Sequence, residues 1–208
     1  MYNFGFSKTQ FDGTEHIYEP SQSLPLPDEY SYMNNLPKVI NQGEDPICVP
    51  CSISSYINWD KNMEDGIVKD NKVDLFQIFK SRSNQDSNDG MSFKDAFKFL
   101  KKEGVSIKDG IYKIKQYATI TNIYALRYAI YMNGPCFGAL PVYNFQNEFW
   151  VKDYQDDLQG FHAISIVGYT KEGFIIRNSW GKSYGKDGYF LIKNENINNF
   201  VELWTIIS

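Results

Sequence analysis

Three residues that could together carry out chemistry on a thiol lie far apart in this chain, in the order cysteine, histidine, asparagine. Cys48 ends the stretch Gln42-Gly43-Glu44-Asp45-Pro46-Ile47-Cys48, where a loop leads into a predicted helix. A cysteine in the first turn of a helix faces unpaired N–H groups and the positive end of the helix dipole, which stabilise a thiolate. His162 and Asn178 follow downstream, sixteen residues apart. Together these residue types predict an acyl-transfer site in which a thiolate is the nucleophile.

Gln42 adds a candidate donor for the negative oxygen of a tetrahedral intermediate. It precedes Cys48 by six residues and Cys51 by nine. An amide N–H aimed at the developing oxyanion often stabilises the transition state by about 3 kcal/mol.

Cys51 gives the same stretch a second interpretation. Cys48-Val49-Pro50-Cys51 is a CxPC motif at a helix start, the redox pattern of thioredoxin-like oxidoreductases. That fold places a βαβ unit around the motif and has no use for His162 or Asn178, so we favour it less. We expect Cys51 to be a buried neighbour of Cys48, and the spacing also allows a reversible disulfide that would switch the thiol off.

Composition excludes several other classes of function. The 208 residues carry 21 basic and 25 acidic side chains, a net charge of −4, without the basic patch that nucleic-acid binding needs. Three cysteines are too few, and odd in number, for a disulfide-stapled secreted domain. No apolar run approaches the ~20 residues of a membrane span, and the N-terminus lacks the apolar core of a signal peptide. We therefore expect a protein of the cytoplasm or another reducing compartment, with no metal and no cofactor.

The hydrophobic pattern changes its period along the chain. Residues 1–24 predict an extended arm, in which His16 is a surface residue without a catalytic role. Helical periodicity dominates the first half after the arm, and period-two alternation the second, which predicts an α+β fold with two lobes. The predicted helices are 48–63, 74–82, 92–104 and 124–132, and the predicted strands are 136–143, 163–169, 173–177, 189–193 and 201–207.

Four blocks in order make residues 24–208 resemble the papain-like cysteine peptidases. Leu26-Pro27 followed by Val39-Ile40-Asn41-Gln42-Gly43 is similar to the family's mature N-terminus and Gln-Gly loop, and Cys48 takes the nucleophile position. The third block is His162-Ala163-Ile164 with Val167-Gly168-Tyr169, and the fourth is Asn178-Ser179-Trp180-Gly181 with Tyr184-Gly185 and Asp187-Gly188-Tyr189.

The resemblance implies a peptidase domain over 25–208, with a helical lobe at about 42–125, an antiparallel β-rich lobe at about 133–208 and an active-site cleft between them. It implies a cysteine endopeptidase that works through a thiolate of Cys48 and an imidazolium of His162. By the same resemblance Asn178 orients His162, Gln42 donates to the oxyanion, and Trp180 shields the His162–Asn178 hydrogen bond from water.

Substrate contacts also follow from the resemblance. Gly90 takes the position at which a glycine lets substrate backbone pair with enzyme backbone. Ala139 and Ala163 would line the main specificity pocket, with Phe161 at its mouth. We expect this pocket to accept a bulky apolar side chain of a peptide or protein substrate.

The chain departs from the family pattern around the nucleophile. Val49 replaces a usual tryptophan, Asp45-Pro46 and Ile47 replace a glycine and cysteine, and Phe161 replaces a polar residue. An ordinary inhibitory prodomain needs more than the residues before Leu24, so either the arm plugs the cleft or no such control is needed. The alternative function is a papain-like scaffold with little turnover, associated with a larger assembly such as a virion or surface complex.

Overall fold

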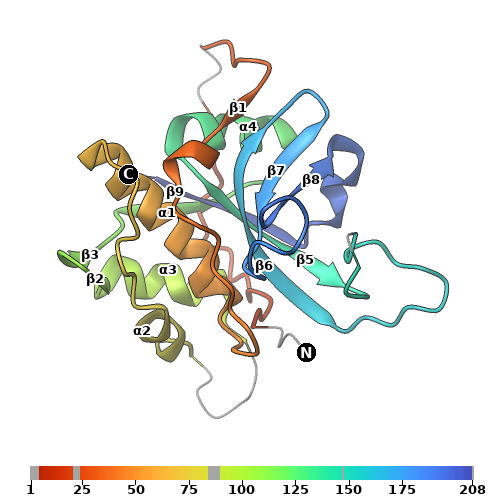
Figure 1. The fold of residues 1–208 in the computed structure, drawn as a ribbon, viewed down its shortest axis with the longest axis horizontal. Coiled ribbons are helices and arrows are strands. Elements are labelled where there is room, and N and C mark those ends of the chain that lie inside the picture. The colour runs from red at the N-terminus through yellow and green to blue at the C-terminus, as the bar shows by residue number, and fades with distance from the viewer. Residues whose placement is uncertain (1–4, 21–23, 84–89, 147, 208) are drawn as a thin grey trace.

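The computed structural model describes residues 5–20, 24–83, 90–146 and 148–207. Helices α1 to α3 lie on one side of the molecule and the longer strands on the other, as the α+β prediction requires (Figure 1). The helices are α1 (Cys48–Asp65), α2 (Leu75–Lys80), α3 (Phe93–Lys102) and α4 (Ile123–Asn133), with short 3-10 helices η1 (Met33–Asn35) and η2 (Asn194–Asn199).

One antiparallel sheet of seven strands dominates the second half of the described chain. Six strands run in the order β4-β9-β5-β6-β7-β8, and β1 pairs with β6 beyond the end of β5, on the edge of β6 opposite β7. Their bounds are β1 (Tyr30–Ser31), β4 (Gln116–Thr119), β5 (Cys136–Val142), β6 (Gly160–Tyr169), β7 (Gly173–Arg177), β8 (Tyr189–Lys193) and β9 (Glu202–Ile207). A separate hairpin joins β2 (Val105–Ile107) to β3 (Gly110–Tyr112).

Helix α1 lies in the centre of the molecule. The predicted apolar positions Val49, Ile53 and Tyr56 are fully buried, but the opposite face of the first three turns is buried as well. The buried serines of α1 donate to carbonyls of the helix itself; Ser52 Oγ, for example, donates to the Cys48 carbonyl at 2.9 Å. Ser165 Oγ on β6 donates to the Ser52 carbonyl at 2.9 Å, which fixes the start of α1 against the sheet.

The helix starts follow local capping chemistry. Ser92 Oγ accepts from the Asp95 backbone N–H at 3.1 Å, which confirms the predicted N-cap of α3. Asp74 and Asn122 cap α2 and α4 in the same way. Helix α1 has no side-chain cap, and it ends at the left-handed Gly66 (φ 67°), three residues beyond the predicted end of the helical pattern.

Some short elements were not predicted. Strands β2, β3 and β4 contain only three or four residues each, too few to reveal a period. Strands β1 and β4 join the sheet although they precede the 133–208 region that we assigned to the β lobe. Of the predicted polar loop at 83–90, residues 84–89 lie outside the described residues.

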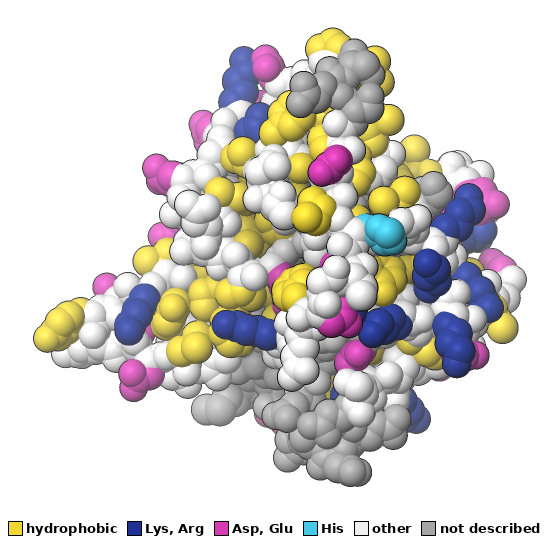
Figure 2. All heavy atoms as spheres, turned by 180° about the vertical axis from the view of Figure 1, so that it is seen from behind, with side chains coloured by type: hydrophobic (Ala, Val, Ile, Leu, Met, Phe, Trp, Pro, Cys, Tyr) yellow, Lys and Arg dark blue, Asp and Glu magenta, His cyan; other side chains and the backbone are white. Residues whose placement is uncertain are grey.

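The N-terminal arm runs over the body of the protein. At one end Phe6 forms a parallel bridge with Met91, and at the other Ile17 forms one with Thr119, the last residue of β4. On the face in Figure 2 positive and negative side chains are interspersed with hydrophobic ones. Among the described residues, no helix has the length and apolar character needed to cross a membrane.

Candidate active site

His162 on β6 and Asn178 just after β7 form the best-defined pair of the site. His162 Nε2 lies 2.7 Å from Asn178 Oδ1, and both side chains are buried. The Ser179 backbone N–H donates to the same Oδ1 at 2.8 Å, which identifies that atom as the amide oxygen. His162 Nε2 therefore carries the proton, and Nδ1, which has no hydrogen-bond partner in the described chain, keeps its lone pair.

Aromatic rings seal this pair from water. The Trp180 ring, to which the sequence analysis assigned a shielding role, stacks on the His162 ring with centroids 4.5 Å apart and an interplanar angle of 24°. Phe149, which the sequence analysis did not identify, contacts His162 edge-on at 5.8 Å and Trp180 at 5.1 Å. Burial is the main cause that lowers the pKa of His162 from 6.5 to about 4, against an opposing contribution from the Asn178 hydrogen bond.

Cys48 is the first residue of α1, and its side chain is inaccessible to solvent. Burial raises the pKa of the Cys48 thiol to about 11, although backbone N–H groups of Ala163 and Gly5 act in the opposite direction. The contact with Ala163 brings the sulfur to the residue that follows His162 in β6. In this conformation both the thiol and the imidazole are neutral, whereas the predicted reactive form is an ion pair.

Two loops hold Gln42 beside the His162–Asn178 pair. Gln42 N donates to the Ser179 carbonyl at 2.8 Å, and Ser179 Oγ donates to Gln42 Oε1 at 2.6 Å. Gln42 Nε2 donates one hydrogen to the Asp45 carbonyl at 2.9 Å, on the turn that leads to Cys48. Ser179 binds both Gln42 and Asn178. The loop after β7 therefore connects the predicted oxyanion donor, Gln42, with the residue predicted to orient His162, Asn178.

The residues expected to contact substrate lie on three different segments. Ala139 on β5 and Ala163 on β6 are Cα partners and are fully buried. Phe161 is half-buried two residues before Ala163. Gly90 precedes Met91, the residue whose backbone pairs with Phe6 of the arm. The backbone-pairing position that we assigned to substrate is therefore taken by the chain's own N-terminal arm.

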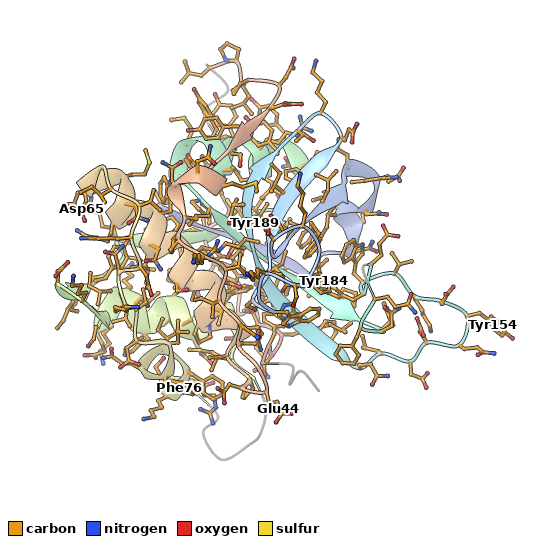
Figure 3. The ribbon with its side chains drawn as sticks, viewed as in Figure 1. Glu44, Asp65, Phe76, Tyr154, Tyr184 and Tyr189 are labelled. Carbon is orange, nitrogen blue, oxygen red and sulfur yellow. The ribbon has the colours of Figure 1, made fainter. Side chains whose placement is uncertain are left out.

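Sequence reasoning missed several neighbours of the site. Gly5 and Phe6 come from the arm, and Phe149 comes from the segment between β5 and β6; none of them belongs to a recognisable motif. In Figure 3 that segment extends away from the body with Tyr154 at its tip, whereas Tyr184 lies near the centre of the molecule. Tyr184 contacts Trp180 edge-on at 5.0 Å. No cluster of three or more potential metal ligands occurs within the described residues.

A sequence model described as papain family cysteine protease matches residues 65–203, more than half of the chain. The chain belongs to the papain family. The matched range contains His162 and Asn178 but begins after Cys48, so the positions of Gln42 and Cys48 rest on the geometry above. The thioredoxin-like interpretation is excluded, because the seven strands of the large sheet pair antiparallel and the described residues form no βαβ unit.

Two relatives illustrate the extent of the similarity. A gut-specific cysteine proteinase of Caenorhabditis elegans is 32% identical over 92 residues, which cover 41% of this chain and 28% of that protein. The cathepsin B-like CP1 of Giardia intestinalis is 55% identical over 38 residues, 16% of this chain and 12% of that protein. The papain-family chain thus spans less than a third of the length of these relatives.

Solved structures share the whole architecture. Xylellain, a cysteine protease from Xylella fastidiosa, superimposes with a TM-score of 0.86 at 22% identity and covers 100% of this chain and 96% of its own. The digestive procathepsin L2 proteinase of Tenebrio molitor gives a TM-score of 0.76 at 18% identity, over 100% of this chain and 78% of its own. At these identities the likeness establishes the fold: the papain-like two-lobed α+β fold predicted from the sequence is confirmed.

Proposed function

We propose that this papain-family protein is a cysteine endopeptidase in which Cys48 is the nucleophile and His162 the acid and base. The proposal is supported above all by the 2.7 Å contact between His162 Nε2 and Asn178 Oδ1, which leaves Nδ1 as the basic nitrogen. The start of α1 supplies the thiol next to β6, where the dipole and the N–H groups of the first turn favour a thiolate once water reaches the site.

The first half of the reaction forms an acyl-enzyme. The Cys48 proton passes to His162 Nδ1, and the sulfur attacks the carbonyl carbon of the scissile peptide. The Cys48 backbone N–H and the second hydrogen of Gln42 Nε2 would stabilise the oxyanion. His162 Nδ1–H then protonates the leaving nitrogen as the C–N bond breaks, so that the amine leaves neutral.

The second half hydrolyses the thioester. His162 Nδ1 removes a proton from water while the oxygen attacks the acyl carbon, and the C–S bond breaks as the thiolate leaves. Through both halves Nε2–H stays on Asn178, and Trp180 and Phe149 keep competing water from that hydrogen bond. The balance is one peptide bond and one water consumed, and one carboxylic acid and one amine released, after which the acid gives its proton to the solvent.

The experiment compares two cysteine variants on a peptide library. Cys48→Ala should abolish cleavage, whereas Cys51→Ala, whose thiol is equally buried one turn along α1, should retain much of it. Cleavage at an unchanged rate in Cys48→Ala would assign the reaction to another group or to a contaminant. A folded protein that turns over nothing under any activating condition would favour the alternative, a scaffold with little or no proteolysis.

We further propose that Ala139, Ala163 and Phe161 border a pocket for a bulky apolar substrate side chain, with Gly90 at the backbone-pairing edge. The small side chains on paired strands and the partly exposed aromatic ring support this assignment. Ala163→Phe should shift the library preference toward smaller residues, whereas a preference for charged residues in the parent protein would contradict it.

The cellular setting is a proposal as well. Cys48, Cys51 and Cys136 are free thiols in the structure, which supports a function in a reducing compartment. Viral cathepsins are among the similar proteins. One of them, from Adoxophyes honmai nucleopolyhedrovirus, is 49% identical over 41 residues, which cover 18% of this chain and 12% of that protein. Association with a virion or a larger assembly is therefore a testable extension of the proposal. Size-exclusion chromatography of the native source with an antibody to this chain would separate an assembled from a free protein.

A further inference from the structure

Helix α1 carries a second thiol, Cys51, one turn after Cys48, and the proposed mechanism does not use it. Both cysteines are free thiols, with exposed fractions of 0% for Cys48 and 3% for Cys51. Residues three apart in a helix lie on the same face, with Cβ atoms about 5–6 Å apart. Cys48 and Cys51 therefore form a CxxC dithiol at a helix start, from which a disulfide can form without the thioredoxin-like fold excluded above.

The first turn of α1 is able to bring the two sulfur atoms together. A disulfide joins residues whose Cα atoms lie about 4.4–6.8 Å apart, and a helical separation of three residues gives about 5 Å. The two Cβ atoms must approach by about 1–2 Å. The first helical hydrogen bond runs from Cys51 N to the Ile47 carbonyl at 2.9 Å. The three residues before Cys51, one of which is Pro50, donate no helical hydrogen bond, so Cys48 can shift toward Cys51 without breaking one of theirs.

Arg177 on β7 supplies a buried positive charge near Cys51. Arg177 is 4% exposed, and its guanidinium donates to the Tyr189 hydroxyl at 2.6 Å and to the Lys38 carbonyl at 2.9 Å, both uncharged oxygens. Burial raises the pKa of the Cys51 thiol and the neighbouring Cys48 raises it further, whereas the charge of Arg177 acts in the opposite direction. The cation therefore favours a thiolate at Cys51, which is the form that attacks a neighbouring oxidised sulfur.

We propose that Cys51 is a resolving thiol, which captures the nucleophile Cys48 as a disulfide after hydrogen peroxide has oxidised it. The inference rests on the proposed function, because a state of the site that admits a substrate carbonyl to Cys48 also admits the smaller peroxide. It assigns Cys51 a chemical role that peptide hydrolysis does not require.

The oxidation takes place in two steps. The Cys48 thiolate attacks peroxide, so that an S–O bond forms, the O–O bond breaks and hydroxide leaves. The Cys51 thiolate then attacks the Cys48 sulfur, so that the S–S bond forms, the S–O bond breaks and a second hydroxide leaves. The two hydroxides take up the two thiol protons. Two thiols and one peroxide thus give one disulfide and two waters, and two electrons pass from the sulfur atoms to the peroxide.

The competing fate of the oxidised nucleophile gives the proposal a measurable consequence. Without a resolving thiol, excess peroxide converts the sulfenic acid of Cys48 to a sulfinic acid, which thiol reductants do not reverse. A disulfide, in contrast, is restored to two thiols by dithiothreitol. If Cys51 were only a small apolar packing residue, its removal would leave the reversibility of the oxidation unchanged.

The test oxidises the full chain with excess hydrogen peroxide, removes the peroxide with catalase and then adds dithiothreitol. Hydrolysis of a fluorogenic peptide is measured before oxidation, after it and after reduction. The parent is compared with Cys51→Ala, and Cys136→Ala is the matched control, because Cys136 is a fully buried cysteine on β5. Oxidised samples are blocked with iodoacetamide and digested without reductant, and mass spectrometry then maps the disulfide and the sulfinic acid. Unfolding midpoints establish that all three proteins are folded.

We expect peroxide to abolish hydrolysis in all three proteins, and dithiothreitol to restore most of it in the parent and in Cys136→Ala. The recovered fraction should be at least about fivefold smaller in Cys51→Ala, with a sulfinic acid at Cys48. An oxidised parent without a Cys48–Cys51 disulfide would overturn the inference, and this result depends on no variant. Equal recovery in the parent and in folded Cys51→Ala would overturn it as well.

The same samples distinguish this inference from the proposed function. A Cys48–Cys51 disulfide in a parent protein that hydrolyses no peptide before oxidation would retain the resolving role of Cys51 and refute the peptidase function. Hydrolysis before oxidation without this disulfide afterwards would do the reverse.

Discussion

Gly5→Ala is the smallest change that should open the site. The added methyl carbon would lie 1.9 Å from the Pro46 carbonyl oxygen. Ordinary contact between heavy atoms begins near 3.5 Å, so one of the two segments must withdraw by roughly 1.5 Å. The Pro46 segment is braced by the Ile47 N–H, which donates to the Asp45 carbonyl at 2.9 Å, and by Gln42, so we expect the arm to withdraw.

The size of the effect follows from what the displaced arm loses. The two hydrogen bonds to Met91, at 2.8 and 3.1 Å, each contribute about 1 kcal/mol. Complete exposure of the Phe6 side chain would cost about 1.5–3 kcal/mol. A partial loss gives a range of about 2–4 kcal/mol, which changes the ratio of molecules with the arm in place to molecules with the arm withdrawn by roughly 30-fold to several hundred-fold.

The assay is the rate of iodoacetamide labelling at Cys48, with peptide hydrolysis measured on the same samples. Gln10→Ala is the control, because Gln10 is an exposed residue of the same arm. Gly5→Ala should label and hydrolyse at least tenfold faster than Gln10→Ala at a similar unfolding midpoint. If labelling is unchanged and the midpoint falls, the Pro46 loop moved instead of the arm, and the argument from close approach is refuted.

Three further predictions concern the catalytic groups. In steady-state assays Gln42→Ala should lower kcat/KM by about 10²–10³-fold, the usual effect of losing an oxyanion donor. Ser179→Ala should lower it by only about tenfold, because it removes the hydrogen bond to Gln42 Oε1 and leaves that of Gln42 Nε2 to the Asp45 carbonyl. Asn178→Ala should lower kcat more than it raises KM, because His162 loses the acceptor at 2.7 Å that fixes its tautomer. Burial lowers the pKa of His162 from 6.5 to about 4. Between pH 6.5 and 4 the unfolded chain therefore binds more protons at this residue than the folded protein does. The free energy of unfolding should fall by up to about 3 kcal/mol as the pH drops through this range. Denaturant titrations should show a smaller fall in His162→Gln, and equal falls would contradict the buried neutral imidazole.

The family and the fold could be predicted because their determinants are local in sequence. The block around Asn178 forms one loop, and the helical stripe of α1 recurs within a few turns. The full burial of α1 was hidden, because Ser52 and Asn58 look like a solvated face. Their side chains instead donate to carbonyls one turn back, at 2.9 Å in each case, which makes them compatible with a buried helix.

The packing of the N-terminal arm against the site could not be predicted from local patterns, because its contacts join distant parts of the chain. Nothing near Gly5 shows that its missing side chain is required by Pro46, about forty residues later. The bridge between Phe6 and Met91 likewise pairs a residue of the arm with one that lies beyond α2. Such requirements appear only when two backbones are seen to approach each other, which needs the folded structure.

One motion of the arm changes both access to the thiol and its ionisation. With the arm packed against the site, burial raises the pKa of Cys48 to about 11 and lowers that of His162 to about 4, so both groups are neutral at neutral pH. Withdrawal of Gly5 admits water, which removes the desolvation that disfavours each charge, while the dipole of α1 and the Asn178 hydrogen bond remain to favour the ion pair. The fixed groups of the site therefore specify a thiolate and an imidazolium, and the arm decides when that pair can form.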